Sequence, residues 1–233
     1  MLLIAHRSGP DTYPEQTIQS GREALSFGAD LIEIDVRPTA DNQAAMSHDP
    51  DAKRIFGVDK KISDMTAAEF KMLRHLKDPA FSSHMIADVF AAGLKPLLIH
   101  VKDKRALPAL LKVIDEYDYA GNVTIGVADV GSVTHIRNHN PAIKILSFSA
   151  TVEQIPAMVE AGVDYVRLWE KWLTPENVQM VRDLGAKLWV MSGVIRVNTG
   201  YPTEEDLEKI LAYKPDGLLI NEIRFAKKII SRM

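Results

Sequence analysis

Residues 28–36 of the chain read GADLIEIDV, a glycine followed by a short apolar run that carries two acidic residues at alternate positions. A similar order of glycine or proline, a small or polar residue and an apolar run returns later as AGVDYVRLW (161–169), LGAKLWVMS (184–192) and KPDGLLINE (214–222). Glycine commonly closes a helix, and a short apolar run is typical of a parallel strand that is buried on both faces. The pattern therefore predicts repeated helix-to-strand units.

Eight apolar runs are expected to form strands, and amphipathic segments between them are expected to form helices. Several of these helices begin after a threonine, as at Thr151, Thr174 and Thr203, and glycines 28, 93, 162 and 185 close helices. The predicted strands are Leu2–His6, Leu31–Val36, Pro96–Val101, Asn122–Val127, Lys144–Ser149, Tyr165–Trp169, Lys187–Ser192 and Gly217–Glu222. The predicted helices lie at about 17–28, 103–118, 129–138, 151–161, 174–185, 203–213 and 222–231. Eight such units predict an α/β fold, the (β/α)8 TIM barrel.

One stretch, about residues 39–95, departs from this rhythm. An extra strand-like segment at Gln43–His48 is followed by a polar stretch and two predicted helices. We interpret it as a small insertion between strands 2 and 3. Because it is too short to bury an independent core, the chain is expected to form a single domain over residues 1–233.

Composition narrows the classes of function. The chain has 233 residues, 46% of them hydrophobic, and a net charge of -3 with scattered Lys and Arg, which argues against nucleic acid as a partner. With no cysteine, any metal must be bound by oxygen and nitrogen ligands. Without a basic leader or a long apolar run, we expect no membrane anchor and a cytoplasmic location.

Candidate functional residues stand at the predicted carboxyl ends of the strands, which converge on one face of a barrel. Glu33 and Asp35 lie two apart on one strand, so both side chains point to the same face and could together bind a divalent cation. The other polar or aromatic residues expected there are His6, His100, Lys102, Trp169, Ser192 and Asn221/Glu222.

Each of these residues also has an ordinary structural interpretation. A Glu/Asp pair can be a solvated face, a histidine can be a hydrogen-bonded core residue, and Arg7 can form an ion pair with Glu33 or Asp35. The joint occurrence of two histidines, two carboxylates and an arginine favours metal-assisted phosphoester chemistry.

The ordered residues His6-Arg7-Ser8-Gly9, Pro14-Glu15-Gln16-Thr17, Gly28-Ala29-Asp30, Glu33-Ile34-Asp35-Val36, Thr39, Asp41 and His48-Asp49 resemble the glycerophosphodiester phosphodiesterase family, part of the PLC-like phosphodiesterase superfamily. The resemblance implies a (β/α)8 barrel with a small insertion after the second strand. It also implies that His6 and His48 are the catalytic acid/base pair, that Arg7 contacts phosphate, and that Glu33 and Asp35 bind a metal ion, Mg²⁺ or Ca²⁺.

The third ligand position differs from the family pattern. The family has a Glu-x-Lys motif at the end of strand 3, whereas residues 98–102 read LIHVK, so His100 takes the ligand position and Lys102 retains the lysine. As a ligand, His100 would weaken Mg²⁺ or Ca²⁺ and favour Mn²⁺ or Zn²⁺. Alternatively, His100 does not bind metal and the chain is impaired, unless Glu170 or Glu222 compensates.

The sequence thus predicts metal-dependent hydrolysis of a glycerophosphodiester, or a related sugar or alcohol phosphodiester, to glycerol 3-phosphate and an alcohol. Lys102 joins Arg7 in the predicted substrate site, and Trp169 would form an apolar wall for the alcohol, with Trp172 and Trp189 as further candidates. One alternative is a phosphodiester lyase that forms a cyclic phosphate. The other is a degenerate, non-catalytic barrel that binds a phosphodiester or phosphosugar, motivated by His100 and by altered strand ends at Trp189–Asn198 and Asn221-Glu222. The expected partner is a small phosphodiester, and a homo-oligomer is left open.

Overall fold

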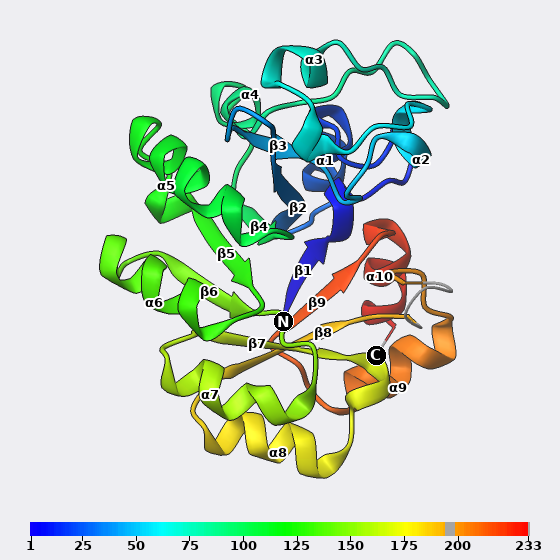
Figure 1. Ribbon diagram of the computed structural model, residues 1–233. Helices are drawn as coiled ribbons and strands as arrows, with labels where there is room; N and C mark the ends of the chain where they lie inside the picture. The colour runs from blue at the N-terminus through cyan, green and yellow to red at the C-terminus, as the bar shows by residue number, and fades with distance from the viewer. Residues whose placement is uncertain (194–198, 233) are drawn as a thin grey trace.

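A closed barrel of eight parallel strands forms the centre of the computed structural model, which describes residues 1–193 and 199–232 (Figure 1). Because β1 pairs with both β2 and β9, the sheet has no free edge along the barrel. The barrel strands are β1 (Leu2–Ala5), β2 (Leu31–Pro38), β4 (Leu97–Val101), β5 (Val123–Val127), β6 (Lys144–Ser147), β7 (Tyr165–Trp169), β8 (Lys187–Met191) and β9 (Gly217–Ile220). The predicted fold class and all eight strand positions are confirmed. Within Trp189–Asn198, residues 194–198 lie outside the described residues.

Helices follow the barrel strands as the sequence predicts. Their bounds are α1 (Ile18–Ser26), α5 (Leu107–Glu116), α6 (Val130–His139), α7 (Ile155–Glu160), α8 (Pro175–Asp183), α9 (Glu204–Ala212) and α10 (Ile223–Ile230). Thr174 and Thr203 accept hydrogen bonds from the backbone N–H of Asn177 and Asp206, which caps α8 and α9. Thr151 makes no such bond, since its segment begins with the 3-10 turn Val152–Gln154. No helix in the described ranges is long and apolar enough to cross a membrane.

The insertion predicted at about 39–95 begins with β3 (Ala44–Met46), which pairs antiparallel with β2. It continues through α2 (Lys53–Phe56), the 3-10 turn η2 (Ile62–Asp64), α3 (Ala67–Lys71) and α4 (Ile86–Ala91), so three short helices replace the two predicted. Local signals define them, because Gly57 ends α2 with φ 72° and Thr66 and Glu69 form a capping box on α3. The segment packs a small apolar cluster of its own: Ala45, Ala52, Ile62, Met65, Phe70 and Met85.

Apolar side chains pack on both faces of the barrel sheet. The larger lies between the strands and the outer helices, and the smaller fills the barrel interior with Ile4, Leu98, Leu146, Trp189, Met191 and Leu219. Trp189 is 1% exposed and its ring stacks on Tyr165, so it packs the core and is not available as part of a substrate wall. The indole occupies space beside Gly217, where a side chain would not fit.

We expect Gly217→Ala to destabilise the protein by about 1–3 kcal/mol, because the added Cβ would lie 2.7 Å from Trp189 Cδ1 in a packed interior. Gly121→Ala is the matched control, since a Cβ there meets no atom within 4 Å. Urea unfolding followed by circular dichroism measures both. Equal stabilities for the two variants would contradict the packing described for Trp189.

Candidate active site

The predicted site residues meet at the carboxyl ends of the first barrel strands. His6 directly follows β1, and Glu33 and Asp35 lie in β2. His100 lies in β4, where Asp35 and His100 are register partners across the parallel pair. The parallel sheet therefore brings together side chains that are more than sixty residues apart in sequence.

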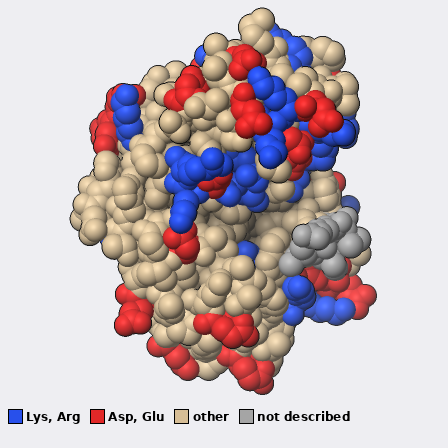
Figure 2. All heavy atoms as spheres, in the orientation of Figure 1, with Lys and Arg blue, Asp and Glu red and all other residues tan. Residues whose placement is uncertain are grey.

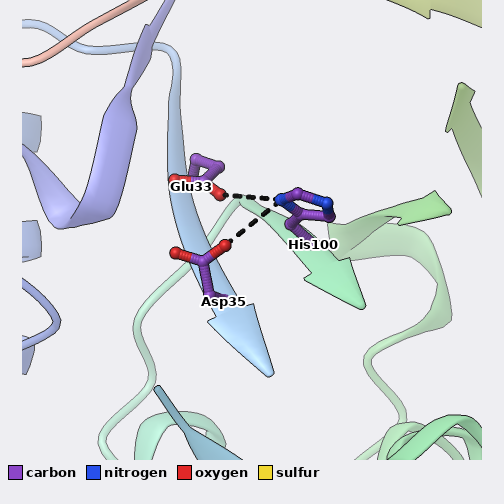
Figure 3. A group of neighbouring side chains, drawn as sticks. All are labelled: Glu33, Asp35 and His100. Atoms are coloured by element: carbon purple, nitrogen blue, oxygen red, sulfur yellow. Dashed lines mark ion pairs between the residues drawn. The ribbon is translucent and has the colours of Figure 1, made fainter. Parts of the chain in front are cut away.

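Glu33, Asp35 and His100 form a compact set of candidate cation ligands (Figure 3). His100 Nδ1 lies 3.2 Å from Asp35 Oδ1 and 3.9 Å from Glu33 Oε1, and one potential ligand atom from each residue lies within 4.8 Å of the others. Both carboxylates are 1% exposed. Figure 3 shows an oxygen of each pointing toward the imidazole.

The remaining carboxylate oxygens are held by neighbouring groups. Glu33 Oε2 accepts a hydrogen bond from the backbone N–H of Arg7 at 2.7 Å, and Asp35 Oδ2 accepts one from Gln16 Nε2 at 2.7 Å. Asp35 Oδ1, in contrast, is buried without a hydrogen bond. Each carboxylate is thus anchored through one oxygen and directs the other toward His100, as cation ligands must be.

Electrostatics also fits a cation at this point. Burial, and then the neighbouring charge of Asp35, raises the pKa of Glu33 well above its usual range. Burial opposes ionisation of Asp35 as well, but the positive charge of Lys102 and the close approach of the His100 imidazole hold the pKa of Asp35 well below its usual range. Two carboxyl groups in one dry site therefore do not both ionise readily unless a cation joins them. Two oxygens and one imidazole nitrogen are a suitable donor set for a divalent ion.

His100 is held in its neutral form and in a fixed orientation. Burial, and then the positive charge of Lys102, lowers the pKa of His100 to about 4, which leaves the ring uncharged near neutral pH. Its ring stacks on Phe148 with centroids 3.7 Å apart and planes inclined by 5°. A neutral imidazole oriented in this way retains a nitrogen lone pair for a cation.

Arg7 connects the carboxylates with the second histidine. Its backbone lies in the left-handed region, with φ 50°, and this conformation accompanies the N–H bond to Glu33. The guanidinium forms an ion pair with Glu15 at 3.1 Å and donates from Nη2 to His48 Nε2 at 2.9 Å. The alternative in which the guanidinium pairs with Glu33 or Asp35 is not what the structure shows.

His48 is supported by a carboxylate. Its Nδ1 lies 2.7 Å from Asp49 Oδ1, and Asp49 also accepts a 2.5 Å hydrogen bond from Arg54 Nε. On the other side of the ring, Nε2 faces Arg7 Nη2 and, at 3.3 Å, Lys102 Nζ. In this arrangement Nδ1 donates to Asp49, and Nε2 accepts from the two cationic side chains.

His6 has a different partner. Its Nδ1 lies 2.7 Å from Asn221 Oδ1, and Asn221 Nδ2 donates to the carbonyl of Thr199 at 3.2 Å, which turns the amide oxygen toward His6. Burial, and then the positive charge of Arg7, lowers the pKa of His6 to about 3. The two histidines therefore differ, since one rests on a neutral amide and the other on a carboxylate.

One face of the molecule is hollowed (Figure 2). Figure 2 shows a recess near the middle of the displayed face, with Lys and Arg side chains gathered along the rim below the part of the chain that contains α1 to α4. Positive charge at the edge of a recess favours an anionic ligand.

Most of the sequence-predicted residues lie together, with one group set apart. Arg7, Glu33, Asp35, His48, His100 and Lys102 are linked by the contacts above, and His6 precedes Arg7 in the chain and contacts Asn221. Trp169 ends β7, and its ring lies 4.2 Å from the Arg167 guanidinium, so the predicted apolar wall has a cation against it. Glu170 accepts a hydrogen bond from Gly193 N at 2.6 Å, and among the described residues neither it nor Glu222 joins the candidate cation ligands.

Sequence reasoning missed three supporting residues. Gln16 donates a hydrogen bond to Asp35, Asp49 accepts one from His48, and the Arg167 guanidinium lies against the ring of Trp169. Gln16 and Asp49 belong to the ordered residues that resemble the family but were given no role there, and the signal for Arg167 is that it is the single charge within the apolar run YVRLW (165–169).

The sequence is similar to a known protein family and to individual members of it. The sequence profile of the "Glycerophosphoryl diester phosphodiesterase family" matches residues 6–196. A glycerophosphodiester phosphodiesterase from Caldanaerobacter subterraneus is 25% identical over 238 aligned positions that cover 95% of this chain and 94% of that protein.

Solved structures share the fold. A glycerophosphoryl diester phosphodiesterase from Parabacteroides distasonis superposes with a TM-score of 0.81 and 22% identity, covering 99% of this chain and 86% of that one. A phosphodiesterase from Oleispira antarctica, solved with the product sn-glycerol-3-phosphate, gives a TM-score of 0.80 and 18% identity over 99% and 97% of the two chains.

The burial of His6 leads to a testable pH dependence. The unfolded chain takes up a proton at this residue below its ordinary pKa of 6.5, whereas the native state does so only near 3, so stability is lost as pH falls between these values. In chelator-treated protein, the free energy of unfolding of His6→Gln should therefore fall less steeply with decreasing pH than that of the wild type. The difference in slope should be about 1.4 kcal/mol per pH unit between pH 6 and 4. Urea titrations across this range measure it, with His135→Gln, exposed on α6, as the control. An unchanged slope in His6→Gln would be inconsistent with a buried neutral His6.

Proposed function

The chain belongs to the glycerophosphoryl diester phosphodiesterase family, and from this we propose that it hydrolyses a glycerophosphodiester to glycerol 3-phosphate and an alcohol. The observation that carries the proposal is the pair of buried carboxylates, Glu33 and Asp35, within contact of His100 and beside two histidines in different environments. Such a set can stabilise charge on a phosphoryl group and move two protons.

Glu33, Asp35 and His100 would hold one divalent cation. A bound cation would neutralise charge that develops on the phosphoryl oxygens. Because an imidazole replaces the family's third carboxylate, the set has one negative charge fewer and should favour Mn²⁺ or Zn²⁺ over Mg²⁺ or Ca²⁺. Gln16 and the backbone N–H of Arg7 would keep the two carboxylates in position.

Arg7 and Lys102 would bind the phosphate of the substrate. Their cationic groups lie 2.9 and 3.3 Å from His48 Nε2. Arg7, which follows β1, and Lys102, which follows β4, therefore approach the same point. A phosphate oxygen placed there would accept charge-assisted hydrogen bonds from both. The ion pair with Glu15 would hold the Arg7 guanidinium in this orientation.

The different partners of the histidines suggest different roles. His6, whose pKa is lowered to about 3 by burial, would enter the reaction uncharged and accept a proton from the water that attacks phosphorus. A bound phosphate would take over the hydrogen bonds that Arg7 and Lys102 now donate to His48 Nε2 and so leave this nitrogen able to carry a proton. Asp49 would stabilise the protonated ring through Nδ1, and His48 would then protonate the departing alkoxide. Asn221 acts on His6 as a positioning residue, because it fixes the ring through Nδ1 and leaves Nε2 for the proton.

We expect metal-stripped protein to release no glycerol 3-phosphate from glycerophosphocholine, glycerophosphoethanolamine or glycerophosphoinositol, and Mn²⁺ or Zn²⁺ to restore release better than Mg²⁺ or Ca²⁺. His100→Glu should shift this preference toward Mg²⁺ and Ca²⁺, whereas His135→Glu, on the exposed face of α6, should not. Enzymatic detection of glycerol 3-phosphate measures the rates, and ³¹P NMR identifies the product. A cyclic phosphate would indicate the lyase reaction, and ligand-induced stabilisation without any product would indicate a binding protein.

A second experiment separates the proton acceptor from the donor. His6→Ala and His48→Ala should each lower kcat on a natural diester by about 10²–10⁴-fold. On glycerophospho-p-nitrophenol, whose leaving group departs without a proton, His48→Ala should recover most of its activity and His6→Ala should not. Recovery in His6→Ala alone would reverse the assigned roles, and recovery in neither would remove His48 from leaving-group protonation.

A further inference from the structure

Arg167 is a buried cation in the wall of the barrel. It lies in β7 between Val166 and Leu168, which pack toward the outer helices, and is 3% exposed. Because side chains alternate along a strand, Arg167 points to the same side as Tyr165 and Trp169, the barrel interior. An arginine at such a position is costly unless its charge has a partner.

The structure gives this guanidinium no carboxylate. Among the described residues Arg167 forms no salt bridge, and its Nε and Nη1 are buried without a hydrogen-bond acceptor. Nη2 makes one long contact, 3.4 Å, with the carbonyl of Ser149. The ion-pair network on the other side of the site, by contrast, joins every one of Arg7, Arg54 and Lys102 to a carboxylate.

Aromatic rings contact the guanidinium without satisfying its N–H groups. Its Cζ lies 4.2 Å from the ring centroid of Trp169, 5.2 Å from that of Phe148 and 5.6 Å from that of Trp172. Such contacts stabilise the charge through the ring faces. The rings do not accept hydrogen bonds from the N–H edge of the guanidinium, so this edge remains available to an acceptor. Such an edge binds a planar anion with two hydrogen bonds.

The guanidinium also lies next to the proposed cation ligands. Phe148 and Ser149 follow β6, and Trp172 follows β7, so the side chain extends toward the carboxyl ends of the strands. Phe148 stacks on His100, and Arg167 contacts the same Phe148 ring. Arg167 is therefore one aromatic ring away from His100, on the side opposite β1 and β2.

We propose that Arg167 binds an anionic group, a carboxylate or a phosphate monoester, on the alcohol portion of the substrate. Arg7 and Lys102, the proposed ligands of the diester phosphate, lie on the β2 side beside His48, so a substrate that crosses the site would bring its alcohol toward β7. An unpaired guanidinium there selects a negative group and repels a quaternary ammonium group such as that of choline. This inference rests on the proposed function for the identity of the diester, but the anion site itself does not.

The first test compares two matched pairs of diesters that differ by one anionic group. These are glycerophosphoinositol 4-phosphate against glycerophosphoinositol, and glycerophosphoglycolate against glycerophosphoethylene glycol. One charge-assisted hydrogen-bonded pair predicts a preference in kcat/KM of about tenfold to a hundredfold for at least one anionic member. Arg167→Met should bring that ratio close to one, Arg167→Lys should retain part of it, and Arg105→Met, an exposed charge, should retain all of it. No preference in the wild-type protein, or the same preference in Arg167→Met, would overturn the proposal.

The second test needs no turnover. Isothermal titration of Mn²⁺-loaded protein with 2-phosphoglycolate and with ethyl phosphate should show tighter binding of the former in the wild type and equal binding in Arg167→Met. Binding of this kind without hydrolysis of any diester would reject the proposed function and keep the anion site. Hydrolysis of diesters with equal binding of the two probes would keep the function and reject the anion site.

Thermal unfolding of the free variant distinguishes a structural role. Removing an unpaired buried charge should not lower the melting temperature of Arg167→Met. If the variant unfolds or is markedly destabilised, Arg167 is a packing residue, and the charge preference of the wild type then decides alone whether an anion binds.

Discussion

Two carboxylates buried side by side, Glu33 and Asp35, are the constraint on which the rest of the site depends. At 1% exposure they have almost no water to stabilise their charge, and each disfavours ionisation of the other. Neighbouring polar and charged groups reduce the cost of burying these charges. Lys102 lies 3.7 Å from Asp35 Oδ1, and Gln16 and the Arg7 N–H fix one oxygen of each acid. What they leave is a pair of directed oxygens beside a neutral imidazole, an arrangement that the proposed divalent cation would complete.

The barrel separates two positive regions around this pair. Near β1 and β2, cationic side chains are compensated by Glu15, Asp35 and Asp49 and converge on His48. Near β7, the guanidinium of Arg167 contacts aromatic rings and one backbone carbonyl, and it has no carboxylate partner among the described residues. His100 and Phe148 stand between the two regions as a stacked pair. The site is thus asymmetric, with one region suited to the diester phosphate and another suited to a charge on the alcohol.

The positions of the strands were predictable because strands buried on both faces read as continuous apolar runs, and all eight runs are barrel strands. The convergence of His6, Glu33, Asp35 and His100 followed from the rule that parallel strands end on one face. The number of helices in the insertion did not follow, since capping at Thr66 and Gly57 defines short helices that have no apolar period.

The hydrogen-bond partners were less predictable. Arg7, Ser8 and Gln16 are non-glycine residues with positive φ, and this loop geometry, invisible in the sequence, directs the Arg7 N–H to Glu33 and brings Gln16 to Asp35. Arg167 was visible as a charge in an apolar run. Whether such a charge has a carboxylate partner depends on residues from β6 and on the turns that follow β6 and β7. Only the three-dimensional structure reveals that Arg167 has no carboxylate partner among the described residues and that its Nε and Nη1 lack an acceptor.

The most direct measurement of the central claim is pulsed electron paramagnetic resonance of the Mn²⁺-loaded protein. An imidazole nitrogen bound to the ion produces a ¹⁴N coupling in the electron spin-echo envelope, so the ligand itself is detected without reference to activity. We expect this coupling in the wild type and in His6→Gln, and its loss in His100→Glu with Mn²⁺ still bound. A coupling that persists in His100→Glu, or that is absent from the wild type, would show that Glu33, Asp35 and His100 are not the cation site.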